Sequence, residues 1–212
     1  MKTLMKLAAG LCIALSLGAC AAPQSASRAA MPDDTMLGTL VPDYRIDSFT
    51  VSVPRSLEVN ERNTYYPRGD IVWRGDPLGD RHAQVKAIVE AGLSEGISAM
   101  EPGAVPVVMD VEVTRFHALT EKARYTIGGV HAIQFKMQLR NPETGQAYGE
   151  PHLVKADFKA LGGAKAIEAE RNGITQKHRI TEHLAKVIQT ELASPDGYKA
   201  ANNGLMGAIN QL

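Results

Sequence analysis

The chain has 212 residues, a formal net charge of zero, 44% hydrophobic residues and 22% charged residues, which is the composition of an ordinary globular protein of about one domain. The balanced charge argues against a nucleic-acid binder, because such proteins carry a concentrated basic face. After the first 20 residues there is no apolar run of about 18 or more residues, so we expect no transmembrane helix.

The amino-terminal residues have the pattern of an export signal. Lys2 and Lys6 are the only charges before Cys20, and an apolar run of about eleven residues follows them. That run is too short to cross a bilayer, which needs about 20 apolar residues. Small residues then precede a cysteine in the order Leu17-Gly18-Ala19-Cys20. We predict a signal peptide over residues 1–19, the alternative being a plain secretory signal cut near the following alanines.

Leu17-Gly18-Ala19-Cys20 resembles the lipobox of bacterial lipoproteins, in which the cysteine sulfur receives a diacylglyceryl group before cleavage on its amino side. The resemblance implies a mature chain that begins at a lipidated Cys20, carries fatty acids such as palmitate, and faces the periplasm. Several acyl chains make a stable anchor, since each buried methylene adds about 0.8 kcal/mol. Ala21 stands where an Asp retains many Gram-negative lipoproteins at the inner membrane, which favours the outer membrane.

The only cysteines are Cys12 and Cys20. Cys12 leaves with the predicted signal peptide and Cys20 takes the lipid, so we expect a mature protein without a disulfide or a free thiol. Residues 20–42 are predicted to be the lipidated terminus and a flexible tether, because they are rich in Ala, Ser, Pro and Gln. The folded domain is predicted over 43–195, and a loose tail over 196–212.

The folded part is predicted to begin with a strand over 44–53, which is rich in β-branched and aromatic residues. Its alternation slips over 46–49, which indicates a bulge or burial on both faces. A long irregular segment over 56–81 follows. Asp80 then caps a predicted helix over 81–100, whose apolar residues recur at three- and four-residue steps.

Three further strands are predicted over 106–119, 130–140 and 147–161, each with alternating apolar and polar residues. The first two are joined by a connection over 120–129. The last two are joined by a hairpin loop over 141–146, where Pro and Gly occupy turn positions. We therefore expect an antiparallel meander that follows a parallel pair made through the helical crossover.

A second helical region starts near Ala164 and ends at Ser194-Pro195, and Gly173 is expected to divide it into a short and a longer helix. In the first helix, Gly92 and Gly96 lie on or beside the apolar stripe and are expected to permit a close approach to the sheet. The order strand, helix, three strands, helix predicts an α+β two-layer sandwich with a mixed sheet of about four strands and two helices on one face.

The irregular segment 56–81 contains the only Trp, two adjacent Tyr and three Gly-Asp pairs. A loop of this length is uncommon unless it is functional or packed on its own side chains. In one interpretation it is a lid over a sheet edge, formed by Tyr65, Tyr66, Ile71 and Trp73. In the other it is a partner-binding surface, because Trp, Tyr and Arg dominate interface energetics; its residues would be Tyr65, Tyr66, Trp73 and Arg74.

The sequence contains no recognisable catalytic motif. His178 and His183 are five residues apart, whereas a zincin helix needs two His four apart with a Glu beside the first. His117 and His131 come near each other if the strands around 120–129 pair. The three Gly-Asp pairs do not follow the spacing of an EF-hand loop, and pairing with nearby arginines is the simpler interpretation. We expect no enzyme activity, catalytic residue, bound metal or cofactor.

The strings YYPRGDIVWRGDP, RFHALTEKARYTIGGVH and ITQKHRITEHL are similar to an uncharacterised family of alphaproteobacterial lipoproteins. The element order behind a lipobox also resembles auxiliary lipoproteins of ABC-type lipid transporters and of lipopolysaccharide insertion. The resemblance implies a non-enzymatic envelope lipoprotein, an accessory or partner-binding component of a transport or assembly complex. The alternative is a periplasmic module that binds a lipid or small molecule in a cleft between the sheet's open face and the long loop.

Overall fold

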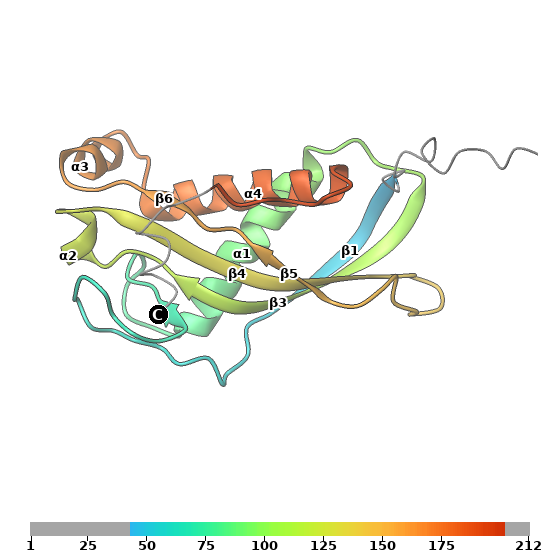
Figure 1. Cartoon of the computed structure of the whole chain (residues 1–212), viewed down its shortest axis with the longest axis horizontal. Helices are drawn as coiled ribbons and strands as arrows, with labels where there is room; N and C mark the ends of the chain where they lie inside the picture. The colour runs from blue at the N-terminus through green and yellow to red at the C-terminus, as the bar shows by residue number, and fades with distance from the viewer. Residues whose placement is uncertain (1–42, 202–212) are drawn as a thin grey trace, which may run out of the picture. The chain divides into compact units, whose positions relative to one another are not determined.

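The computed structural model describes residues 43–201. The predicted signal peptide, the lipidation of Cys20, the tether and residues 202–212 of the predicted tail lie outside this range. Within it the chain forms six strands and four helices (Figure 1), in an α+β arrangement that confirms the predicted fold class.

The sheet has the strand order β1-β3-β4-β5. β1 (Tyr44–Ser52) pairs in parallel with β3 (Val105–His117), and the crossover between them contains α1 (Arg81–Ser98). β4 (Gly129–Arg140) pairs antiparallel with β3, and β5 (His152–Lys155) pairs antiparallel with β4. The predicted parallel pair and meander are therefore confirmed. The predicted bulge is also present, because the register of β1 shifts between Ile46 and Ser48.

Two short strands complete the sheet. β2 (Ile71–Val72) pairs with β3 beyond the end of β1, so the irregular segment contributes a strand to that edge. β6 (Phe158–Ala160) pairs with the start of β4 beyond β5. The prediction of one strand over 147–161 is therefore wrong, and the interruption lies at Asp157. The carboxylate of Asp157 accepts a hydrogen bond from the Ile133 N–H at 2.9 Å, in place of a strand carbonyl.

The three helices other than α1 are α2, α3 and α4. α2 (Glu121–Arg124) occupies the predicted connection over 120–129, where the Thr120 hydroxyl accepts from the Ala123 N–H. α3 (Ala164–Arg171) and α4 (Gln176–Ala193) are separated near Gly173, as predicted, and the Thr175 hydroxyl caps α4.

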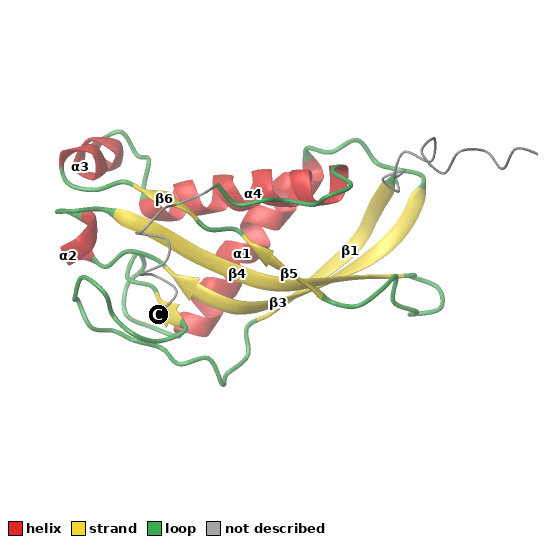
Figure 2. Ribbon diagram, viewed as in Figure 1, coloured by secondary structure: helices red, strands yellow, loops and turns green. Residues whose placement is uncertain are grey.

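α1 and α4 pack against each other on one face of the sheet, as Figure 2 shows. Gly92 and Gly96 make this crossing close. A Cβ on Gly96 would lie 2.4 Å from Ile188 Cγ2 and 2.5 Å from the Ala185 carbonyl, and one on Gly92 would lie 2.6 Å from Leu184 Cβ. The expected close approach thus exists, but its partner is α4 rather than the sheet.

The core lies between the two helices and the sheet, and it contains the fully buried side chains Trp73, Phe116, Phe135, Ile88, Leu93, Ile180, Leu184 and Ile188. The opposite face of the sheet carries polar side chains, including the ion pair of Asp110 with Arg140 at 2.7 Å. Across residues 43–201, none of the helices has the length and apolar character needed to span a membrane.

The start of the predicted loose tail is packed against α4. The Tyr198 N–H donates to Glu191 at 2.7 Å, and the Tyr198 ring meets the His183 ring edge-on at a centroid distance of 5.9 Å.

Candidate functional site

Trp73 is part of the core and not of an exposed surface. Its relative exposure is 1%, and its ring meets Phe116 edge-to-face at a centroid distance of 5.7 Å. The indole N–H donates to Asp76 at 2.9 Å, and Asp76 also pairs with Lys177 on α4 at 3.0 Å. Including Trp73 in the predicted partner-binding surface is therefore wrong, because a buried ring cannot touch a partner. Ile71 is buried beside it, in agreement with the lid interpretation.

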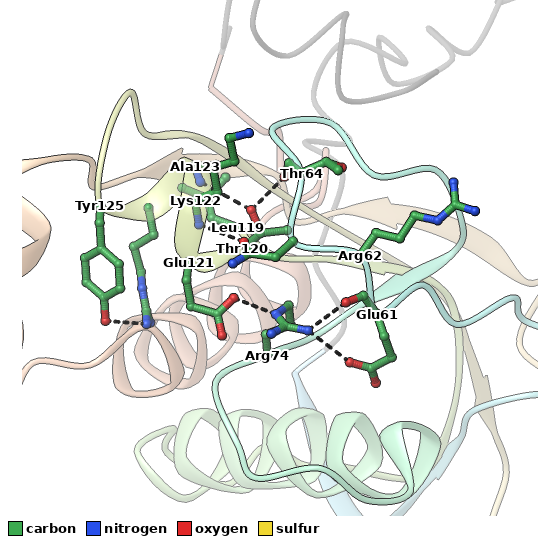
Figure 3. Close-up of polar contacts among 12 residues, drawn as sticks. Glu61, Arg62, Thr64, Arg74, Leu119, Thr120, Glu121, Lys122, Ala123 and Tyr125 are labelled. Atoms are coloured by element: carbon green, nitrogen blue, oxygen red, sulfur yellow. Dashed lines mark hydrogen bonds and ion pairs between the residues drawn. The ribbon is translucent and has the colours of Figure 1, made fainter.

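Glu61 connects the irregular segment to two arginines. The buried Arg81 guanidinium donates from Nε to Glu61 at 2.6 Å. The Arg74 guanidinium donates to the Glu61 carbonyl at 2.6 Å (Figure 3). Arg74 also donates from Nε to Glu121 on α2 at 2.5 Å. Burial raises the pKa of Glu121, but the hydrogen bond from Arg74, a backbone hydrogen bond and the positive charges of Arg74 and Arg124 together lower it below its ordinary value. Arg74 is thus used within the protein, because its Nε donates to Glu121 and its Nη1 donates to Glu61.

Neutral hydrogen bonds hold the same segment against α2. The Thr120 hydroxyl donates to the Thr64 carbonyl at 2.7 Å, and the Lys122 N–H donates to the Asn63 side chain at 2.8 Å. In Figure 3 Thr64 contacts Thr120 directly, whereas Glu61 contacts Arg74, which in turn contacts Glu121. Residues 61–64 are therefore held by contacts with Arg74, Arg81 and α2, although residues 60–66 form no helix or strand.

Tyr65 and Tyr66 are the two predicted binding residues that remain on the surface, with relative exposures of 38% and 50%. The Lys122 ammonium lies 4.7 Å from the centroid of the Tyr65 ring, a cation–π contact. Tyr66 lines a groove beside the start of β4 and the end of β6. The structure thus places the four predicted residues in three different environments, and only the tyrosine pair presents aromatic surface to solvent.

A row of aromatic rings lies where β6 meets α4. The Phe158 ring stacks on His183 at a centroid distance of 4.0 Å and contacts His131 at 4.8 Å. Burial lowers the pKa of His131 to about 3 and that of His183 to about 4. Both histidines are therefore neutral near pH 7. Sequence reasoning gave them no functional role, since neither His131 in an alternating strand nor His183 in an amphipathic helix belongs to a distinctive pattern.

His117 and His131 lie on neighbouring strands, but their rings are on opposite faces of the sheet. His117 is directly opposite Ala132, and successive residues of a strand point to opposite sides. Within residues 43–201, no group of three or more His, Asp or Glu side chains is placed to hold a metal ion.

The aspartates of the Gly-Asp pairs also separate. Asp70 accepts from the Glu58 N–H, Asp76 pairs with Lys177, and Asp80 pairs with Arg55 at 2.6 Å.

These observations define a two-layer α+β domain. The connection between β1 and α1, which contains most of the irregular segment 56–81, is held to α1, α2 and α4 by ion pairs. The chain belongs to a family of unknown function, DUF6778, which matches residues 44–208. Comparison with curated proteins gives no significant match.

Several solved structures are similar in fold. A predicted lipoprotein from Caulobacter crescentus CB15 is 16% identical, covers 51% of this chain and 80% of its own, and has a TM-score of 0.33. Protein XCC0632 from Xanthomonas campestris, of family DUF330, is 10% identical, with coverages of 73% and 88% and a TM-score of 0.39. A minor lipoprotein from Acinetobacter baumannii is 14% identical, with coverages of 72% and 97% and a TM-score of 0.33.

Proposed function

We propose that this protein is a non-enzymatic lipoprotein of the cell envelope, anchored through Cys20, whose folded domain binds a partner protein through Tyr65 and Tyr66. The sequence Leu17-Gly18-Ala19-Cys20 after a short apolar run supports the anchor. The domain then faces the periplasm, and Ala21 favours the outer membrane over the inner membrane.

The observation that carries the partner-binding role is that two adjacent, exposed tyrosines sit on a segment that is already fixed. Aromatic residues on a preorganised segment bind well because little conformational entropy is lost on association. Glu61, Asn63 and Thr64 fix the chain on the amino-terminal side of this pair through Arg81, Lys122 and Thr120.

Affinity capture of the full-length protein from detergent-solubilised envelopes tests this proposal. We expect Tyr65→Ala/Tyr66→Ala to lose a partner that the wild type retains, and Tyr148→Ala, another exposed tyrosine, to keep it. Cys20→Ser should abolish incorporation of a palmitate analogue and release the protein from the membrane fraction. Identical partner profiles for the tyrosine variants would discard the binding surface, and unchanged labelling of Cys20→Ser would discard the anchor.

A further inference from the structure

A groove of about 820 Å³ opens where β4 begins and β6 ends. Its volume is within the range of about 300–1,000 Å³ that is typical of ligand pockets. Part of the lining is apolar and comes from Tyr66, Ile127 and Leu161. Ile127 is 57% exposed, so an apolar side chain faces solvent at this place.

All the charged residues that line the groove are basic: Lys159, Lys165 and Arg179. None of the ion pairs found between residues 43 and 201 uses any of these three side chains. Arg179 is held in place, because it donates to the Lys159 carbonyl at 3.2 Å and its guanidinium lies 5.6 Å from the Phe158 ring centroid. The groove therefore combines apolar surface with positive charge that no salt bridge within the described domain neutralises.

Two glycines, Gly129 and Gly162, line the groove, and each belongs to a pair of adjacent glycines. A Cβ on Gly162 would lie 2.2 Å from the Gly128 nitrogen, so the two backbones are in direct contact here. The Gly163 N–H also donates to the Arg124 carbonyl at 2.9 Å, a second contact between the same two parts of the chain. Since Gly129 and Gly162 contribute no side chains, the space above them stays open.

The groove adjoins a second, smaller cavity of about 10 Å³, and Leu161 and Arg179 line both. Three polar atoms of residues that line it have no hydrogen-bond partner within the described chain: His131 Nδ1, Gln176 Oε1 and Arg124 Nε. His131 and Gln176 are 1% and 6% exposed. Buried polar groups normally have partners, and a cavity of this size holds about one water molecule. This small cavity is thus suited to hold a single polar atom beside the unpaired groups of His131, Gln176 and Arg124.

We propose that this groove binds an anionic phospholipid, with its phosphate at Lys159, Lys165 and Arg179 and an acyl chain along Tyr66, Ile127 and Leu161. Charge complementarity favours this occupant, since the groove offers positive charge and apolar surface side by side. The groove shares Tyr66 with the proposed protein contact, but its basic residues Lys159, Lys165 and Arg179 lie outside that contact. The lysine variants described below therefore test the groove separately from the tyrosine variants.

Site-directed photocrosslinking in cells tests the groove on the intact protein. The chain carries Ile127→p-benzoylphenylalanine, and the cells are grown with radioactive phosphate before irradiation and denaturing purification. We expect a labelled adduct whose phosphate is released by mild alkaline methanolysis, as for an ester-linked phospholipid. The anchor expected at Cys20 is a phosphate-free diacylglyceryl group, so it does not contribute to the label.

The same crosslinker at Leu153, which is 47% exposed on β5 outside the groove, should give little label. In the Ile127 crosslinking chain, Lys159→Gln/Lys165→Gln should reduce the adduct about tenfold, because each exposed charge contact contributes up to roughly a factor of five. Lys86→Gln/Lys186→Gln removes the same charge from exposed helix positions and should leave the adduct unchanged. Equal labelling at positions 127 and 153, an adduct that contains only protein, or equal labelling of both lysine variants would overturn the proposal.

Discussion

Trp73 has two roles at the residue scale, one apolar and one polar. Its ring fills the core beside Phe116, and its indole N–H donates to Asp76, which also pairs with Lys177 on α4. The chain makes room for the ring at Gly75, where a Cβ would lie 2.3 Å from Trp73 Cη2. One side chain thus joins the end of the irregular segment to both the core and α4.

We expect Trp73→Ala to lower the free energy of unfolding by about 3–5 kcal/mol, because it removes a large buried aromatic ring. Trp73→Phe retains an aromatic ring and should lose less. Urea unfolding followed by circular dichroism measures both changes, since the fluorescence of the only Trp is lost in these variants. Tyr148→Ala is an exposed control. A Trp73→Ala variant within about 0.5 kcal/mol of the wild type would contradict this account.

At the scale of elements, periodicity predicts the long pieces of this fold and misses the short ones. β3 and β4 are each longer than ten residues and alternate clearly, so their positions follow from the sequence. β2 has two residues and α2 has four, which is too short for any period to be visible. These elements exist because of partners far along the chain: β3 pairs with β2, and Arg74 contacts α2.

The candidate site follows the same rule. The sequence indicated the tyrosine pair, because aromatic residues in an irregular segment are conspicuous. It did not separate buried Trp73 from exposed Tyr66, since that difference depends on which residues reach the sheet edge. The groove is built by residues from four separated parts of the chain, around 66, 127–130, 159–165 and 179, so no local pattern describes it.

The α1–α4 crossing gives a prediction at this scale. A Cβ on Gly96 would lie 2.5 Å from the Ala185 carbonyl oxygen and 2.9 Å from its Cα, so the backbone of α4 would have to move. Gly96→Ala should therefore destabilise the protein by about 1–3 kcal/mol, although Ala is intrinsically better in a helix by about 1 kcal/mol. Glu95→Ala, on the exposed side of α1, is the control. Urea denaturation decides, and a Gly96→Ala variant as stable as the wild type would show that the helices are not in contact there.

The folded domain holds three histidines as neutral groups, of which His117 and His131 are buried and His183 is half-buried. Burial lowers the pKa of His131 to about 3, and that of His117 and His183 to about 4, from an ordinary value of 6.5. The unfolded chain binds protons at these residues below about pH 6.5, whereas the folded chain does not until pH 4 or lower. The contribution of these histidines to the free energy of unfolding is therefore fully present above pH 6.5 and decreases as the pH falls toward 4. Burial raises the pKa of Asp157, whose contribution has the opposite sign.

A variant at His183 separates these contributions. His183→Phe should preserve the stack between Phe158 and Tyr198 while removing one titrating group. Between pH 6.5 and 5, the free energy of unfolding of the wild type should fall more steeply than that of the variant by up to about 1.4 kcal/mol per pH unit, the value for one proton. Asp157 is present in both proteins, so its effect cancels in this difference. Urea titrations at several pH values measure the two slopes, and parallel slopes would mean that the pKa of His183 is the same in the folded and unfolded protein.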